Sequence, residues 1–259
     1  MKYSMSSRQQ SEYLQKCDEI KVMWNDRNII FDLIDKYPGK TINLCRYLIH
    51  SQDDIDWSEI NKYKMLARDN FIFGLSYVDE MEECKQNGID FYYLEPVRTF
   101  RELHGLKAFG VKCVFIDAPL FFQMDKVREF GIPIRVTANL SVREAFPYAD
   151  GVPGPWIRPE DVDQYEPYVD TIEFSRVNLD QERALFRIYA EQKNWPGDVG
   201  LIIQDINYLG VNRMLPPDMT TRRLNCGQRC MENGRCRLCW RMMDLANPDL
   251  LRDYQKATQ

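Results

Sequence analysis

The sequence predicts an α/β fold, a compact (β/α)8 TIM-like barrel with a C-terminal cysteine-rich metal-binding tail. Three observations lead to this fold class. Short strand-like runs alternate with amphipathic helical stretches eight times from residue 19 onward. Such alternation implies parallel strands joined by right-handed crossovers, and eight units suit a closed barrel. Beyond the last unit, four cysteines lie close together between Cys226 and Cys239.

The composition is that of a soluble globular protein. The 259 residues are 44% hydrophobic and 28% charged, with a net charge of -5 and a mean hydropathy of -0.48. This apolar content can offset the ordering entropy of folding. The longest apolar run is interrupted by Asp117 and Pro119 and is shorter than the roughly 20 residues that span a bilayer. Residues 1–16 lack the apolar core of a signal peptide. We therefore expect a cytoplasmic protein with no membrane partner.

Eight strands are predicted from β-rich runs bounded by turn residues. They are Glu19–Trp24, Lys40–Cys45, Phe71–Ser76, Phe91–Pro96, Cys113–Asp117, Pro133–Asn139, Pro155–Pro159 and Thr171–Ser175. Helices are predicted between them, three of which end at a glycine suited to a C-cap. An open α/β sheet is the alternative, because the units are short and the seventh strand is flanked by prolines. We assign the barrel to residues 1–198 and a C-terminal extension to residues 199–259.

Polar side chains are expected inside this barrel. Successive residues of a strand face opposite sides, so Arg135 and Asn139 lie opposite the apolar face of the predicted sixth strand. Active sites of this fold lie at the C-terminal ends of strands. The candidate catalytic residues are the five polar residues at or near such ends: Glu95, Asp117, Asn139, Arg158 and Glu173. The alternative is that ion pairs fill the lumen, Arg158 with Glu173 and Arg135 with another carboxylate.

The eight cysteines form two groups. Four are scattered, and we expect them to be reduced and structural: Cys17, Cys45, Cys84 and Cys113. The other four have the spacing C-x3-C-x5-C-x2-C, and we expect them to bind one metal centre: Cys226, Cys230, Cys236 and Cys239. Four thiolates suit an iron-sulfur cluster, foremost a 4Fe-4S cluster, or else a structural zinc ion. A site without metal is the third alternative.

The segment around these cysteines is basic. Six arginines and one glutamate lie between residues 222 and 241, so this segment carries +5 and the rest of the chain -10. The guanidinium groups can offset the negative charge of metal-bound thiolates. They can equally contact the phosphates of a nucleic acid, with Trp240 available for stacking on a base.

One stretch is similar to a known family. Arg158, Pro159, Glu160 and Asp161 are followed by Ile172 and Glu173 in the last predicted strand. In these residues the chain resembles the collagenase-like peptidase family, whose barrels carry an Arg-Pro-Glu-Asp turn and then a Lys-Ile-Glu-Gly-Arg strand. Thr171 stands where that family has lysine, and the family's iron-sulfur cysteines, which follow its sixth strand, are absent there. The family includes enzymes that hydroxylate RNA bases and ubiquinone precursors.

The resemblance, taken with the cysteines, implies a metal-containing barrel enzyme. We expect an iron-sulfur-dependent hydroxylation or another redox modification, with an RNA base or an aromatic metabolite as substrate. The alternative is a non-catalytic barrel with a structural zinc knuckle. Such a protein would act as a binding or structural module and would contact nucleic acid through the arginine-rich tail.

Overall fold

The computed structural model describes residues 1–47, 54–116, 120, 123–138, 157–174 and 177–191. The chain divides into two compact units. The first unit consists of Met1–Ile116, Phe130–Val136 and Asp170–Glu173, and the second of Asp117–Glu129, Thr137–Val169 and Phe174–Gln259. The predicted C-terminal extension, with its four clustered cysteines, lies outside the described residues.

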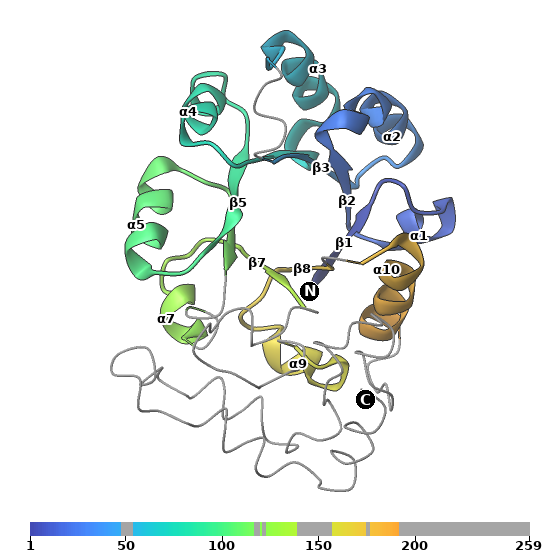
Figure 1. The fold of residues 1–259 in the computed structure, drawn as a ribbon, viewed down its shortest axis with the longest axis vertical. Coiled ribbons are helices and arrows are strands. Elements are labelled where there is room, and N and C mark those ends of the chain that lie inside the picture. The colour runs from blue at the N-terminus through green and yellow to red at the C-terminus, as the bar shows by residue number, and fades with distance from the viewer. Residues whose placement is uncertain (48–53, 117–119, 121–122, 139–156, 175–176, 192–259) are drawn as a thin grey trace, which may run out of the picture. The chain divides into compact units, whose positions relative to one another are not determined.

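Eight parallel strands close into a barrel in sequential order (Figure 1). They are β1 (Lys2–Ser6), β2 (Glu19–Met23), β3 (Thr41–Arg46), β4 (Phe71–Leu75), β5 (Phe91–Val97), β6 (Val114–Ile116), β7 (Ile134–Thr137) and β8 (Thr171–Glu173). All of them belong to the first unit, except that the last residue of β7 belongs to the second. This is the (β/α)8 TIM-like barrel that the sequence predicts.

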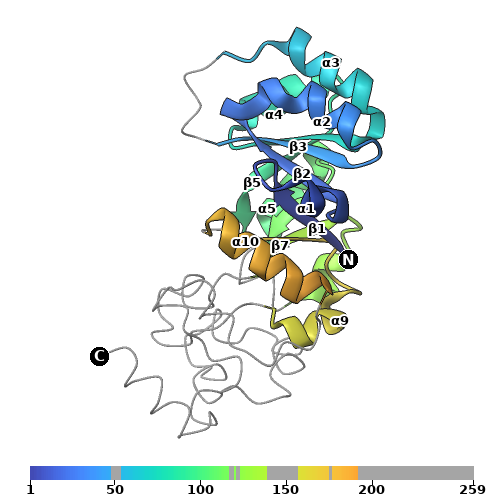
Figure 2. The same ribbon diagram turned by 90° about the vertical axis from the view of Figure 1, so that its right-hand side faces the viewer.

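Helices follow the strands along the chain. The α-helices are α1 (Ser11–Lys16), α2 (Ile30–Lys36), α3 (Trp57–Ala67), α4 (Val78–Gln86), α5 (Phe100–Phe109), α7 (Met124–Arg128), α9 (Val162–Tyr165) and α10 (Leu179–Phe186). Shorter 3-10 turns are η1 (Trp24–Ile29), η3 (Arg68–Asn70) and η4 (Pro159–Asp161), and a π-helical turn, η5 (Arg187–Glu191), extends α10. In the first unit, α1 to α5 lie outside the ring of strands (Figure 1, Figure 2). No described helix is long and apolar enough to cross a membrane.

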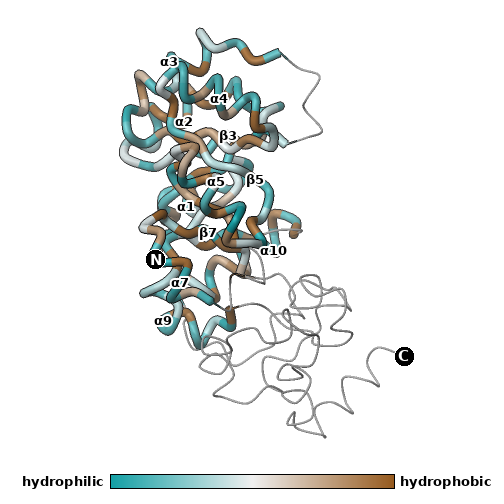
Figure 3. The backbone as a smooth tube through the Cα atoms, turned by 90° about the vertical axis from the view of Figure 1, so that its left-hand side faces the viewer, coloured by the Kyte–Doolittle hydropathy of each residue, from teal (hydrophilic) through white to brown (hydrophobic). Residues whose placement is uncertain are grey.

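Two sets of apolar side chains hold the helices of the first unit against the strands. Helices α3 and α4 alternate apolar and polar residues along their length (Figure 3), and they bury Ile60, Tyr63 and Met81. Ile20 and Val22, the helix-facing residues of β2, are also fully buried. The four scattered cysteines are buried and form no disulfide, which confirms their expected structural role.

Seven of the eight predicted strands are present, and one prediction is wrong. The stretch Pro155–Pro159 contributes no strand in its described part, because Pro159 begins η4 and β7 is instead the neighbour of β8. The eighth strand is β1, which sequence analysis missed. Its sequence, KYSMS, offers only Tyr3 and Met5 as apolar residues, too few to stand out from the polar residues around them.

Aspartates just before two strands attach them to their neighbours. The carboxylate of Asp18, before β2, accepts a hydrogen bond of 2.8 Å from the backbone N–H of Tyr3 in β1. Asp170, before β8, accepts one of 2.7 Å from the N–H of Ile134 in β7. In both cases the aspartate also donates its own N–H to the carbonyl of the same partner. These paired contacts fix the register of neighbouring strands at the N-terminal edge of the barrel. The contacts of Asp170 link the last two strands, β7 and β8.

We predict that Asp170→Ala lowers the free energy of unfolding by about 1 kcal/mol, because the N–H of Ile134 loses its acceptor. Asp170→Asn is the matched control, since its amide oxygen can still accept this bond, and it should lose less. Urea unfolding of the three proteins measures the difference. Equal losses in both variants would show that this hydrogen bond does not stabilise the barrel closure.

Candidate active site

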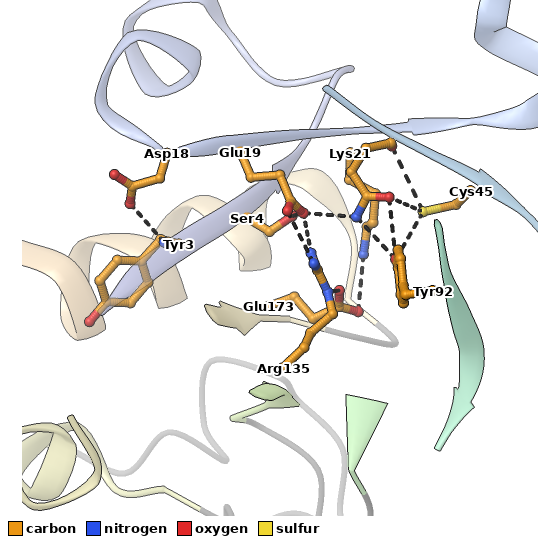
Figure 4. Close-up of polar contacts among 10 residues, drawn as sticks. Tyr3, Ser4, Asp18, Glu19, Lys21, Cys45, Tyr92, Arg135 and Glu173 are labelled. Carbon is orange, nitrogen blue, oxygen red and sulfur yellow. Dashed lines mark hydrogen bonds and ion pairs between the residues drawn. The ribbon is translucent and has the colours of Figure 1, made fainter. Parts of the chain in front are cut away.

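A buried arginine lies at the centre of the barrel lumen. Arg135 of β7 contacts two carboxylates from other strands, those of Glu19 and Glu173 (Figure 4). Its Nη1 donates to Glu19 Oε2 at 3.1 Å, its Nη2 to Glu19 Oε1, and its Nε to Glu173 Oε2 at 3.2 Å. The Arg135 side chain is only 2% exposed. The lumen alternative in which Arg135 pairs with a carboxylate is therefore confirmed.

Neutral side chains complete this network from three further strands. Ser4 Oγ donates to Glu19 Oε1 at 2.6 Å, and Asn43 Nδ2 donates to the same oxygen at 2.8 Å. Asn43 Nδ2 also lies 3.0 Å from the hydroxyl oxygen of Tyr92, whose ring centroid is 5.0 Å from Arg135 Cζ. A buried charge is stable only when it is paired and hydrogen-bonded, and here both the cation and the carboxylates are.

The surroundings fix the protonation of the buried groups. Burial alone would raise the pKa of Glu19, but the charge and hydrogen bonds of Arg135, with those of Ser4 and Asn43, lower it below its ordinary value. Burial raises the pKa of Cys45 to about 12 and that of Cys113 to about 11. Glu19 is thus an anion at neutral pH, whereas the two cysteines remain thiols.

Lys21 occupies a more open part of the same lumen. It lies two residues after Glu19 on β2 and therefore on the same face of the strand. Its Nζ is 3.5 Å from Glu173 Oε1, and the side chains of Lys21 and Glu173 are 13% and 8% exposed. Glu173 thus presents one carboxylate oxygen to Arg135 and the other to Lys21. Among the described residues, the lumen holds the cations Arg135 and Lys21 and the carboxylates of Glu19 and Glu173, and the Lys21–Glu173 pair is the longest and most accessible of their ion pairs.

The structure does not bring the five predicted catalytic residues together. Glu173 lies in the lumen, but Glu95 lies on the other face of β5 and lines a pocket with helices α4 and α5. The reason is that Tyr92 and Leu94 occupy the lumen face of this strand, where both approach Gly74. The prediction that Glu95 faces the lumen is therefore wrong.

The remaining predicted residues have other positions. Arg158 precedes η4 in the second unit and forms a buried ion pair with Asp161, so these two residues of the Arg-Pro-Glu-Asp sequence bond to each other. The partner of Glu173 expected from the sequence was Arg158, whereas the structure pairs Glu173 with Arg135 and Lys21. Asp117 and Asn139 lie outside the described residues.

Sequence analysis missed Glu19, Lys21 and Asn43, although their pattern was visible. Glu19 and Lys21 alternate with Ile20 and Val22 in the same way that Arg135 alternates with Ile134 and Val136. The predicted site residues lie at the C-terminal ends of strands, whereas Glu19 begins its strand. Applying the alternation to whole strands finds all three residues.

In the described part of the chain, no group of three or more His, Cys, Asp or Glu side chains is arranged to hold a metal ion. The expected ligands Cys226, Cys230, Cys236 and Cys239 lie outside that part.

Comparisons with known proteins indicate no family. No family model matches the chain, and no curated protein matches its sequence. A solved structure titled "Native KDPGal structure" is similar over 74% of this chain and 89% of that chain, with a TM-score of 0.42 and 10% sequence identity. A likeness at this level carries no information on function.

We predict that Glu19 makes stability depend on pH. Because the pKa of Glu19 is lowered on folding, its contribution is complete above its ordinary value of 4.5 and is lost as the pH falls below that value. Glu19→Gln should lose about 3 kcal/mol at pH 7 and show a shallower fall in stability than the wild type as the pH drops below 4.5. Urea unfolding against pH measures both effects, with exposed Glu82→Gln as the control. A variant with the wild-type pH profile would refute this role.

Proposed function

We propose that this chain is a barrel enzyme that binds a small polar substrate at the Lys21–Glu173 pair and uses the pair for proton transfer. The observation that carries the proposal is the contrast within the lumen. The Arg135 network is closed and fully buried, whereas the Lys21–Glu173 contact is longer, at 3.5 Å, and partly open. At 3.5 Å the Lys21–Glu173 contact is long for a hydrogen bond, so a substrate oxygen could take its place by accepting a shorter hydrogen bond from Lys21.

The neighbouring groups prepare Glu173 for the role of a base. Arg135 holds Glu173 Oε2 at 3.2 Å, which orients the carboxylate and leaves Oε1 toward Lys21. Glu173 would accept a proton from a substrate O–H or acidic C–H. The Lys21 ammonium would donate a hydrogen bond to the substrate oxygen on which negative charge develops. The substrate class is thus a small molecule with a hydroxyl or carbonyl oxygen next to the bond that loses the proton.

Lys21→Met tests this site without a known substrate. We expect that some members of a panel of small hydroxy acids, keto acids and aromatic metabolites raise the melting temperature of the wild type and fail to raise that of Lys21→Met. The variant itself should lose stability, because the Lys21 and Glu173 side chains are only 13% and 8% exposed, so each melting temperature is compared with that of the same protein without compound. Lys62→Met, on the exposed face of α3, should behave as the wild type. Equal stabilisation of wild type and Lys21→Met would refute the proposed site.

Glu173→Gln then tests whether Glu173 is the base. If it is, the variant should bind the compounds found in the panel and convert none of them. Because Glu173 also pairs with the buried Arg135, the variant should lose about 3 kcal/mol of stability whether or not it is the base, so turnover is the deciding measurement. A wild type that binds no compound of the panel would favour the non-catalytic barrel.

We further propose that Cys226, Cys230, Cys236 and Cys239 hold one metal centre. Their compact spacing and the lack of histidine among them support an iron-sulfur cluster or zinc. An iron-sulfur cluster would supply electron transfer, and zinc would stabilise the tail. The first case supports redox modification of an RNA base or an aromatic metabolite, as the resemblance to the collagenase-like peptidase family suggests.

Anaerobically purified protein distinguishes these metals. We expect a broad absorption band near 400 nm with several iron atoms per chain for an iron-sulfur cluster, or colourless protein with one zinc atom per chain. Cys236→Ser should lose the metal while the barrel keeps its unfolding transition, because the four ligands come from one local segment. Cys84→Ser is the matched control and should retain the metal. Protein that carries neither iron nor zinc would refute the metal centre.

A further inference from the structure

Strand β5 has an uncovered patch on its helix-facing side. In the other described strands, the residues that face the helices are buried, as Phe73 in β4 and Ile134 in β7 are at 0% exposure. On β5, Tyr93 and Glu95 are only partly buried, although both face α4 and α5. A partly exposed carboxylate is unusual between a barrel strand and its helices, where apolar packing normally covers the strand.

The uncovered patch is the floor of a pocket of about 630 Å³ between α4 and α5, which lie side by side in Figure 1. This volume lies within the range of small-molecule sites. The apolar part of its wall consists of Val78, Met81, Tyr93, Val97, Leu106 and Phe109. All of these residues belong to the first unit. The pocket is therefore large enough for a small ligand and is separate from the lumen.

The charge at the pocket floor is negative. Glu95 receives one hydrogen bond, a long one of 3.4 Å from Ser76 Oγ, although a carboxylate can accept several. Burial and the charges of Glu95 and Glu102 raise the pKa of Tyr93, which shows that the potential there is negative. Glu102 already accepts bonds from the backbone N–H groups of Arg98 and Thr99 at the start of α5. Glu95 is thus the acceptor that a ligand would meet.

Two positively charged side chains, Arg98 and Lys85, lie near this pocket. Neither changes the conclusion that Glu95 is the hydrogen-bond acceptor for a ligand. Arg98 lines the pocket and is itself exposed, and Lys85 places its Nζ 5.6 Å from the ring centroid of Phe109. Glu95 and Glu102 balance these two charges in sum, so position decides the sign of the ligand's charge. Arg98 is exposed, whereas Glu95 lies partly buried on β5, where an added anion would have to approach it. An apolar molecule without charge would leave that carboxylate without a strong donor.

We propose that this pocket binds a small organic amine, with its apolar body against Met81, Leu106 and Phe109 and its ammonium group on Glu95. Met81 and Phe109 offer a thioether and an aromatic ring, both of which pack well on an aromatic or branched apolar group. An ammonium ion supplies the charge-assisted hydrogen bonds that Ser76 does not. The ligand class is a primary amine with a body of about the size of a phenylalkyl group, which the pocket can enclose.

Three matched probes test the chemistry of the ligand. We expect 3-phenylpropylamine to bind at least tenfold more tightly than 3-phenylpropanol or 3-phenylpropionate, measured by calorimetry or by NMR titration of the full chain. Glu95→Gln should reduce the affinity for the amine by about tenfold, to that of the alcohol, because the charge-assisted contact is lost. Exposed Glu82→Gln on α4 should leave it unchanged. Equal affinities for amine and alcohol, or no binding of the amine at millimolar concentration, would overturn the proposal.

Gly105 offers a second variant that fills the pocket. It lines the pocket on α5, and a Cβ built there meets no atom within 4 Å. Gly105→Leu should stabilise the helix by about 0.5–1 kcal/mol and abolish amine binding. Lys21→Met, which alters only the lumen, should bind the amine as the wild type does. Amine binding that survives Gly105→Leu would place the ligand elsewhere and refute this site.

Discussion

The buried ion-pair network of Arg135 is the constraint on which the barrel interior depends. An unpaired charge inside a protein costs several kcal/mol, so Arg135 can occupy the lumen only if Glu19 and Glu173 reach it from β2 and β8. Glu19 in turn requires the donors Ser4 and Asn43 from β1 and β3. Each polar residue thus fixes the position of a different strand. The network links β7 to β2 across the lumen and joins β2 to its neighbours β1 and β3.

The same network divides the lumen into a closed part and an open part. Arg135 is held on both sides and has little freedom to contact anything else. Glu173 belongs to both parts, since one oxygen pairs with Arg135 and the other faces Lys21. A carboxylate that is rigidly oriented by one partner and loosely paired with a second is well suited to receive a proton, because its geometry is set before the substrate arrives.

The alternation of strands with helices predicted the barrel, and the alternation of apolar with polar residues along the strands predicted part of its lumen. The second pattern failed for a strand whose two faces carry similar residues. In β7, Ile134 and Val136 mark one face clearly, so Arg135 was placed on the lumen side. In β5 the sequence FYYLEPV has a tyrosine on each face, and the pairing of this strand with β6 shifts register between Tyr93 and Val97. Neither feature can be read from the alternation alone. The orientation of Glu95 depends on which of the two tyrosines faces the lumen. Tyr92 does so because Gly74 on β4 has no side chain and leaves room for its ring, a packing relation between two strands.

The partners of a carboxylate distinguish structural acids from acids that face a ligand. Glu19 has a cation and two neutral donors within the chain, and its lowered pKa follows from them. Glu95 has one long bond from a hydroxyl in a pocket with apolar walls. Such a carboxylate can still accept a hydrogen bond from a strong donor. The chain itself provides strong donors to Glu19, and to Glu95 it provides only the hydroxyl of Ser76. Residue type is the same in the two cases, so what separates a barrel support from a binding site is the supply of donors, together with the partial exposure of Glu95.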